Sequence, residues 1–432
     1  MSPTVEVEAT RNARSAPRRP RAWPRAWLGV LVPAMLLASE YKLRLRSSLA
    51  PVAGRPDLQV VVELGIYTLV ALFLATQFGL PSRGRRPSGL LLLAGYFSAI
   101  MLASTLWAVY PSLALARGYQ LAITAGLAWA IYTYGERDQL HMLCHAYVAL
   151  VAASVCAGVL HPYPRDPGVA NRFNWLHVHP VTAGTYLGLA IVILVAILWE
   201  GGPAHNLLRW PSWIYLALLV VDVGALLATR TRGALGGCVA GCVAILLWGR
   251  RRLSRRDLLA VWLIVGLLTA ALFGNNILAF LLRDQGAARL ESFGGRLPLW
   301  HEAIDLVAQR PLLGYGLTAA RGLFLGSFGL GGGHNAFINV VTDGGLIGSV
   351  CWLSLIVAVF VAVRQLWHLP VAQPDLTVLL GSMVFLVVNG VTTEGLSAAA
   401  NLSSIWLYVV VGWLGVLRRT SAEGAAPRRS SC

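Results

Sequence analysis

Charged and polar side chains that could do chemistry stand isolated among apolar residues in this 432-residue sequence. Arg230 and Arg232 occupy the short turn ATRTRGAL between two apolar runs. His334 and Asn335 follow the glycine run Gly331–Gly333, whose residues give the backbone unusual freedom just before an apolar run. Guanidinium groups suit a diphosphate, which they bind through paired hydrogen bonds, and an imidazole can accept a proton near neutral pH. The pattern predicts a site for an anionic ligand beside a histidine.

Further isolated polar groups fall on what we predict to be the same side of a membrane. They are Asn171, Arg172, His177, His179, Arg117, Arg289, Arg296 and Glu394. A charge at membrane depth costs several kcal/mol, so such groups call for a functional explanation. Plainer interpretations exist. Arg230 and Arg232 could anchor helix ends at lipid headgroups, and Arg289 could be a solvated loop charge. His177 and His179 could be polar residues of the membrane interface.

The composition indicates that lipid is the solvent for most of this chain. Hydrophobic residues make up 56% of the sequence and charged residues 12%, whereas a soluble domain carries roughly 25% charged residues. The net charge of +16 could indicate nucleic acid, but the arginines stand in short clusters between apolar runs, as in cytoplasmic loops of membrane proteins. Five of the six cysteines lie in apolar runs and are interpreted as small buried hydrophobes. We expect no nucleic acid, metal ion or cofactor.

Apolar runs long enough to cross about 30 Å of hydrocarbon recur along the sequence. They predict an all-α, polytopic integral membrane protein with about twelve transmembrane helices. The predicted spans are 26–40, 58–80, 89–110, 113–134, 139–160, 178–199, 212–228, 234–249, 258–282, 336–364, 376–395 and 402–417.

The distribution of arginines predicts the orientation of these spans. With the N-terminus in the cytoplasm, the basic clusters at 83–86, 250–256 and 418–429 face inward, as loops rich in Lys and Arg do. Basic residues at 42–55 fall outside and go against this rule. We therefore predict that both termini are cytoplasmic and that segment 283–335 is extracytoplasmic.

The segment 283–335 is longer than an ordinary connection, and loops of that length usually carry function. Within it, Pro298–Gln309 is predicted to form an amphipathic helix at the membrane interface, with its tryptophan among the headgroups. Its apolar face is predicted to consist of Trp300, Ala303, Ile304 and Val307. The predicted organisation is a disordered basic cytoplasmic tail (1–25), a first transmembrane bundle (26–282), the extracytoplasmic loop (283–335), C-terminal transmembrane helices (336–418) and a cytoplasmic tail (419–432).

This loop and the span after it carry a series of motifs. The series begins at Arg296 and continues with Trp300, Pro311-Leu-Leu-Gly314-Tyr-Gly316, His334-Asn335 and Asp343-Gly-Gly345-Leu-Ile-Gly348. Over about 296–348 the order resembles the signature domain of the O-antigen ligase and O-antigen polymerase superfamily. Elsewhere the resemblance is limited to the number of spans, the arginine turn at 230–232 and the position of the long loop.

The resemblance implies a metal-independent glycosyltransferase at the outer face of the inner membrane, which transfers a glycan from undecaprenyl diphosphate to a sugar hydroxyl. His334 and Arg296 would be catalytic, and Arg296 with Arg230 or Arg232 would hold the diphosphate. We place Arg172 in the same diphosphate-binding set. The supporting residues are Asn335, Trp300 and Arg289. The implied partners are the bilayer, the donor, the acceptor and other polysaccharide assembly proteins. The loop is shorter than in family ligases, which favours a polymerase over ligation to lipid A core.

Two other function classes compete with this interpretation. A transporter or flippase for an anionic solute or lipid-linked glycan would line its pathway with the arginines. It predicts charged or broken helices near mid-bilayer, where Asp222 and Asp343 are the main candidates. A non-catalytic membrane scaffold would leave the pair His334-Asn335 unexplained.

Overall fold

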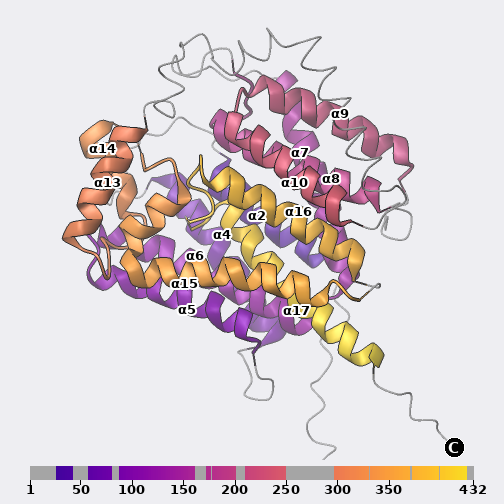
Figure 1. Ribbon diagram of the computed structural model, residues 1–432, viewed down its shortest axis with the longest axis horizontal. Helices are drawn as coiled ribbons and strands as arrows, with labels where there is room; N and C mark the ends of the chain where they lie inside the picture. Colours follow the sequence, from indigo (N-terminus) through magenta and orange to yellow (C-terminus); the bar gives the residue numbers. More distant parts are fainter. Residues whose placement is uncertain are drawn as a thin grey trace, which may run out of the picture.

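A computed structural model describes residues 26–41, 57–79, 87–160, 172–176, 178–200, 210–249, 296–329, 331–369, 372–397 and 399–425. Within these ranges the chain folds into thirteen α-helices and one 3₁₀ turn (Figure 1). The helices are α2 (Trp27–Glu40), α4 (Leu58–Phe78), α5 (Gly89–Ala103), α6 (Pro111–Tyr134), α7 (Arg137–Leu160), α8 (Pro180–Trp199), α9 (Ser212–Ala228), α10 (Arg232–Trp248), α13 (Leu297–Gln309), α14 (Ala319–Phe328), α15 (Ala336–Leu366), α16 (Gln373–Gly390) and α17 (Leu402–Ala425).

Seven of the described helices are long and apolar enough to cross a membrane, namely α4, α5 with the 3₁₀ turn that follows it, α7, α8, α15, α16 and α17. Three further apolar helices, α2, α9 and α10, are shorter. Each predicted span coincides with a described helix except 258–282, which lies outside the described residues. The all-α, polytopic membrane fold is thereby confirmed. The predicted number of about twelve spans exceeds the seven that length and hydropathy support in the described part of the chain.

Local side chains set several helix boundaries. Asp57 accepts a hydrogen bond from the backbone N–H of Val60 at 2.9 Å, and Ser88 accepts one from Leu91 at 3.2 Å. These contacts satisfy N–H groups that a helix start would otherwise leave unpaired. Pro180 occupies the first turn of α8, where the N–H that proline lacks would have no helical partner.

The helices pack closely where glycines allow it. Residues 402–417 of α17 are buried throughout, and this helix contacts α5, α6, α7, α15 and α16. Helix α10 packs along α16, where a Cβ on Gly233 would collide with the side chain of Thr392. Small residues permit such close helix contacts in membranes. The packing therefore brings the start of α10, which begins at Arg232, against the end of α16.

Helix α15 is broken at Gly345, whose φ of 58° is left-handed. The part from Leu346 to Leu366 is about 30 Å long at about 1.5 Å per residue, enough to cross the hydrocarbon alone. Exposed apolar side chains occur along this part, at Leu346, Ile347, Val350, Leu353, Val357 and Val361. The part before the break has no exposed residue. The second part alone has the length and the lipid-facing surface of a span.

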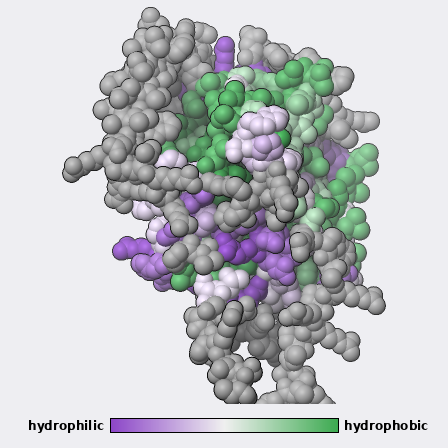
Figure 2. Space-filling model, turned by 90° about the vertical axis from the view of Figure 1, so that its right-hand side faces the viewer, coloured by the Kyte–Doolittle hydropathy of each residue, from purple (hydrophilic) through white to green (hydrophobic). Residues whose placement is uncertain are grey.

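Helices α13 and α14 lie together at one end of the bundle, and the C-terminal end of α17 lies at the other (Figure 1). Seen from that other end, hydrophilic residues gather in the middle of the face, and hydrophobic surface extends beside them (Figure 2). In Arg419, Nη1 donates to the carbonyl oxygens of Tyr132 and Thr133, which ties this end of α17 to α6. One end of the bundle therefore carries α13 and α14, and the other carries the C-terminal end of α17.

The amphipathic helix was predicted at nearly its observed bounds, but its buried face is different. Leu299 and Ala303 of α13 are buried against Ala320 and Phe324 of α14, a helix that was not predicted. Ile304, predicted on the apolar face, is 62% exposed. Much of the apolar face of α13 is therefore covered by protein.

Candidate active site

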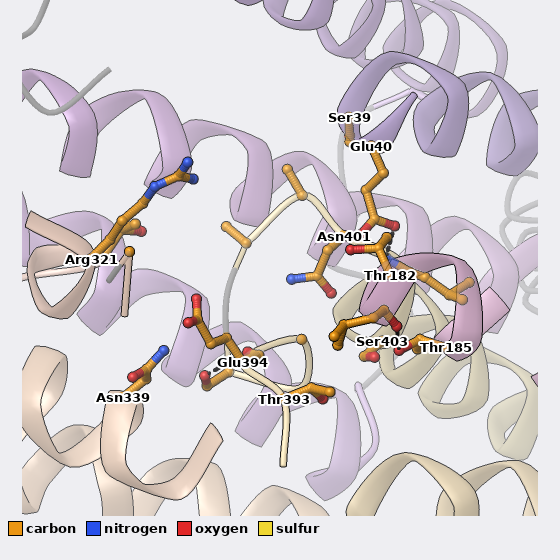
Figure 3. A pocket seen from close by; sticks show the side chains of 18 of the residues that line it. Ser39, Glu40, Thr182, Thr185, Arg321, Asn339, Thr393, Glu394, Asn401 and Ser403 are labelled. Carbon is orange, nitrogen blue, oxygen red and sulfur yellow. Dashed lines mark hydrogen bonds between the residues drawn. The ribbon is translucent and has the colours of Figure 1, made fainter. Parts of the chain in front are cut away.

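A cavity of about 420 Å³ is lined in part by Arg321 of α14 and by Thr318, which precedes that helix. Its lining falls into two groups that face each other (Figure 3). The first group comes from α14, α15, the segment between them and the segment after α16, and it contains Arg321, His334, Asn339, Asp343, Thr393 and Glu394. The second group, from the ends of α2, α8 and α17, contains Ser39, Glu40, Thr182, Thr185, Asn401 and Ser403. The cavity therefore joins a charged side to a side rich in hydroxyl and amide groups.

His334 lies at this cavity next to Glu394. The Nδ1 atom of His334 is 3.5 Å from Oε1 of Glu394, and the backbone N–H of His334 donates to the same oxygen at 3.4 Å. The side chains are 35% and 27% exposed, and both line the cavity. The predicted catalytic histidine therefore faces a cavity that could admit a substrate.

The glycine run before His334 is fixed by its surroundings. A Cβ on Gly332, which has a φ of 128°, would collide with the carboxyl group of Glu394. The N–H of Gly333 donates to Oδ1 of Asn339 at 2.9 Å, and its carbonyl oxygen accepts from the indole of Trp300 at 3.0 Å. Gly332 is favoured by its positive φ and by the nearby carboxyl group, and the hydrogen bonds of Gly333 hold the backbone that leads into His334.

Asn335 and Trp300, predicted as supporting residues, both act on the backbone around the histidine. Asn335 is the N-cap of α15, where its side chain accepts from the N–H groups of Phe337 and Ile338 at 2.8 and 3.3 Å. Trp300 holds the carbonyl of Gly333 from α13. The third predicted supporting residue, Arg289, lies outside the described residues, as do Asn171 and His177.

The two glycine motifs of the sequence are in direct contact at the break in α15. The N–H groups of Tyr315 and Gly316 donate to the carbonyls of Thr342 and Asp343 at 3.0 and 2.8 Å. A Cβ on Gly345 would lie 2.5 Å from the backbone of Leu312. These contacts satisfy carbonyls that a broken helix leaves without intrahelical partners.

Asp343 links the break to α14. Its carboxylate accepts from the backbone N–H groups of Thr318 and Ala320 at 2.8 and 2.7 Å. A carboxylate is stabilised at a helix start by these N–H groups and by the helix dipole. Helix α14 is thereby fixed above the cavity, and it carries Arg321, which lines the cavity.

The predicted diphosphate-binding arginines form a band beside the cavity. Burial is the largest cause that lowers the pKa of Arg172, and the charges of Arg230 and Arg232 lower it further. Burial also lowers the pKa of Arg296, with Glu394 acting in the opposite direction and Arg232 in the same one. These guanidinium groups are therefore close enough for their positive charges to repel one another, which a bound anion would relieve.

Backbone carbonyls hold two of these arginines in place. In Arg296, Nη1 donates to the carbonyl oxygen of Thr392 at 3.0 Å and faces that of His334 at 3.5 Å. In Arg172, Nε donates to the carbonyl of Thr229 at 2.8 Å. Arg232 has a buried Nε with no hydrogen-bond partner among the described residues.

The structure thus brings Arg172, Arg230, Arg232 and Arg296 together, and Arg296 next to His334. None of the four arginines is among the residues that line the cavity. The cationic residues that do line it are Arg117 and Arg321. In Arg117, Nη1 pairs with Glu63 at 2.5 Å, so much of its charge is compensated. His179 is the N-cap of α8 and also lines the cavity.

Left-handed backbone conformations concentrate around this site. Among the described residues, five that are not glycine have positive φ: Leu176, Arg230, Thr318, His334 and Ala400. Three of them line the cavity, and the other two belong to the segments that carry the arginine band. Such conformations cost about 1–3 kcal/mol each, and they cluster at functional sites.

Burial sets the protonation of the two groups that meet at the cavity. It lowers the pKa of His334 to about 4, and the nearby charge of Arg296 contributes. It raises the pKa of Glu394 to about 7, against the lowering effect of Arg321. His334 is therefore neutral at pH 7 and able to accept a proton.

Sequence reasoning did not mention Arg321, and it named Asp343 only within a glycine motif and as a candidate charge of a transporter. Glu394 was noted only as an isolated acid, and its contact with His334 joins segments that are 60 residues apart. Arg321 belongs to α14, whose short sequence carries no strong helix signal. Among the described residues, no group of three or more His, Cys, Asp or Glu side chains is arranged to hold a metal ion.

No curated protein matches the chain. Residues 215–353 match the family described as O-antigen ligase, a range that runs from α9 into α15 and includes Arg230, Arg232, Arg296 and His334. Residues 215–353 of this multi-pass membrane protein are therefore similar to the O-antigen ligase family.

Proposed function

We propose that the protein is a glycosyltransferase of the inner membrane that transfers a glycan from undecaprenyl diphosphate to a sugar hydroxyl. It would polymerise or ligate a cell-surface polysaccharide such as O-antigen. The observation that carries the proposal is the position of His334, which lines the cavity and whose carbonyl faces Nη1 of Arg296 at 3.5 Å. A proton acceptor thus adjoins a band of guanidinium groups.

In the proposed reaction the acceptor oxygen forms a bond to the anomeric carbon of the donor sugar. The bond between that carbon and the diphosphate oxygen breaks, and its electron pair leaves with the diphosphate. The hydroxyl proton passes to His334, which is neutral at pH 7 because burial lowers its pKa to about 4, and then to solvent. A positioned base of this kind contributes about 10²–10⁴-fold to the rate.

The departing diphosphate would be bound by four arginines, Arg172, Arg230, Arg232 and Arg296. In Arg296, Nη1 is held by backbone carbonyls, which orients the remaining N–H groups of the guanidinium plane. Preorganised cations act most strongly where charge grows in the transition state. In this proposal guanidinium groups supply the positive field, and the reaction is independent of metal ions.

The proposal includes the arrangement in the membrane. Segment 283–335 would face outward between transmembrane parts at 26–282 and 336–418, with the tails 1–25 and 419–432 in the cytoplasm. Support comes from the bundle itself, where α13 and α14 lie at the end opposite the C-terminal end of α17 (Figure 1). The observed α17 continues to Ala425, so the second tail begins as helix.

The decisive test is transfer in vitro by the protein in lipid nanodiscs. The donor is a synthetic undecaprenyl-diphosphate-linked oligosaccharide, with the same oligosaccharide as acceptor. We expect lengthened product from the wild type, also with EDTA present, and a loss of about 10²–10⁴-fold in His334→Ala. Equal product from well-folded His334→Ala would remove the histidine from the mechanism, and a loss in EDTA restored by a divalent cation would contradict the metal-independent reaction.

A transporter or flippase is the competing function, and the break in α15 at Gly345 is the observation in its favour. In transporters, the carbonyls at such a break coordinate the transported ion or substrate. Here the carbonyls of Thr342 and Asp343 accept from Tyr315 and Gly316 instead. If the nanodiscs form no product and sealed vesicles move the lipid-linked glycan across the bilayer, the competing function is correct.

A further inference from the structure

The carboxylate of Glu394 lines the cavity, and the proposed reaction does not use it. It stands between α16 and α17, outside both helices. One carboxylate oxygen, Oε1, faces two N–H groups that His334 can present, the backbone N–H at 3.4 Å and Nδ1–H with Nδ1 at 3.5 Å. The side-chain distance is at the long limit of a hydrogen bond, as is common for catalytic pairs before a substrate binds.

The surrounding chain is built to accommodate this carboxylate. Gly332 passes so close to it that any Cβ there would collide with the carboxyl group. The carbonyl oxygen of Glu394 accepts from the N–H and the hydroxyl of Ser397 at 3.2 and 2.9 Å, and Arg296 holds the carbonyl of Thr392 two residues before. The backbone is therefore fixed on both sides of Glu394, and the side chain is directed at the histidine.

We propose that Glu394 is a positioning residue for His334, whose Nδ1–H it accepts so that Nε2 is left unprotonated toward the acceptor hydroxyl. When Nε2 takes the hydroxyl proton, the imidazole becomes an imidazolium cation, and the carboxylate of Glu394 stabilises it. No proton needs to pass to Glu394, and the cation returns its proton to solvent after the diphosphate has left. Carboxylates play this part beside histidines in several unrelated enzymes.

The charges that face the pair define its pH dependence. Glu394 interacts with Arg321 and Arg296, which favour its anion, and with Asp343, which opposes it. Burial is the largest effect and raises the pKa of Glu394 to about 7. The carboxylate needed for positioning is therefore present above about pH 7 and is lost as the pH falls through that value. His334 stays neutral over this range, since its pKa is about 4.

The geometry of the pair can be tested without any substrate. The protein is labelled with ¹⁵N-histidine, placed in nanodiscs and titrated by NMR, and the His334 signals are identified by their loss in His334→Ala. We expect the Nδ1–H tautomer to increase as the pH rises through about 7, because Glu394 becomes an anion there. Glu394→Gln should abolish this step. Glu40→Gln, which removes a carboxylate from the other side of the cavity, should keep it.

The catalytic consequence rests on the proposed function and is measured separately. In the transfer assay, wild-type product should rise with pH through about 7, and Glu394→Gln should lose about 10²-fold or more with a flat profile in that range. Glu394→Asp should retain part of the pH step. A tautomer step that is absent from the wild type, or that persists in Glu394→Gln, would overturn the pairing even if His334→Ala is inactive. If the tautomer step is present but His334→Ala forms normal product, the pairing stands and the proposed base is wrong.

Discussion

The indole nitrogen of Trp300 lies 3.0 Å from the carbonyl oxygen of Gly333, one residue before His334. This hydrogen bond ties α13, which begins after Arg296, to the backbone on which the histidine stands. The arginine and the tryptophan are four residues apart, so they emerge from the same side of the first helical turn. Arg296 contacts the carbonyl of His334, and Trp300 that of Gly333, so both residues hold the same stretch of chain.

Trp300→Phe should weaken activity by misplacing His334, because the ring still packs and only the hydrogen bond is lost. A hydrogen bond contributes about 1 kcal/mol, which corresponds to about a fivefold loss of product in the transfer assay. Trp367→Phe, in the turn after the long part of α15, is the matched control and should keep full activity. Unchanged product from Trp300→Phe would mean that the glycine run is held well enough without the indole.

Arg296→Lys tests whether charge alone is sufficient beside His334. Lysine keeps the charge but loses the planar fork that can bind two carbonyls and a diphosphate together. We expect Arg296→Lys to be almost as inactive as Arg296→Ala, with normal protein levels in the membrane. Arg418→Lys is the control, because Arg418 donates to Gln365 at the other end of the bundle. Near-normal product from Arg296→Lys would refute paired recognition at this position.

Membrane orientation can be measured with a phosphatase that is active only outside the cytoplasm. We expect activity from a fusion after Ser327, in α14, and none from a fusion after Ser421, in α17. Helix α14 and the C-terminal end of α17 lie at opposite ends of the bundle (Figure 1). Activity only after Ser421 would reverse the orientation and place the cavity on the cytoplasmic side. Equal activity from both fusions would contradict the prediction that the two ends lie on opposite sides of the membrane.

The membrane helices were predictable because a span has to be apolar along about 20 residues, a signal that needs no tertiary information. The break at Gly345 was not predicted, because apolar residues continue on both sides of Asp343-Gly344-Gly345 and the chain that approaches Gly345 at Leu312 belongs to another segment. The packing of α13 against α14 was not predicted for a related reason. Periodicity places Ile304 on the apolar face of α13, but only the position of α14 decides which part of that face is covered.

The candidate site was only partly predictable. His334 and Arg296 were found because their motifs resemble those of a family, and the structure brings the two residues into contact. The sequence indicated neither the cavity beside them nor its lining by Arg321 and Glu394, since both depend on where separate segments meet. The glycine run was interpreted as conformational freedom, and Gly332 uses that freedom with a φ of 128°. The sequence did not indicate that the carboxyl group of Glu394 also approaches this glycine.

The contact between the turn at 311–316 and the break in α15 joins two points that are about 30 residues apart in sequence. The chain between them includes α14 and the glycine run, and both of its ends are held at this contact. For a loop whose two ends are held together, doubling the length adds only about 0.6 kcal/mol to the entropic cost of closing the loop. Relatives could therefore lengthen or shorten this segment and so change which ligands fit in the cavity. The contact at the break in α15 and the position of His334 would stay the same.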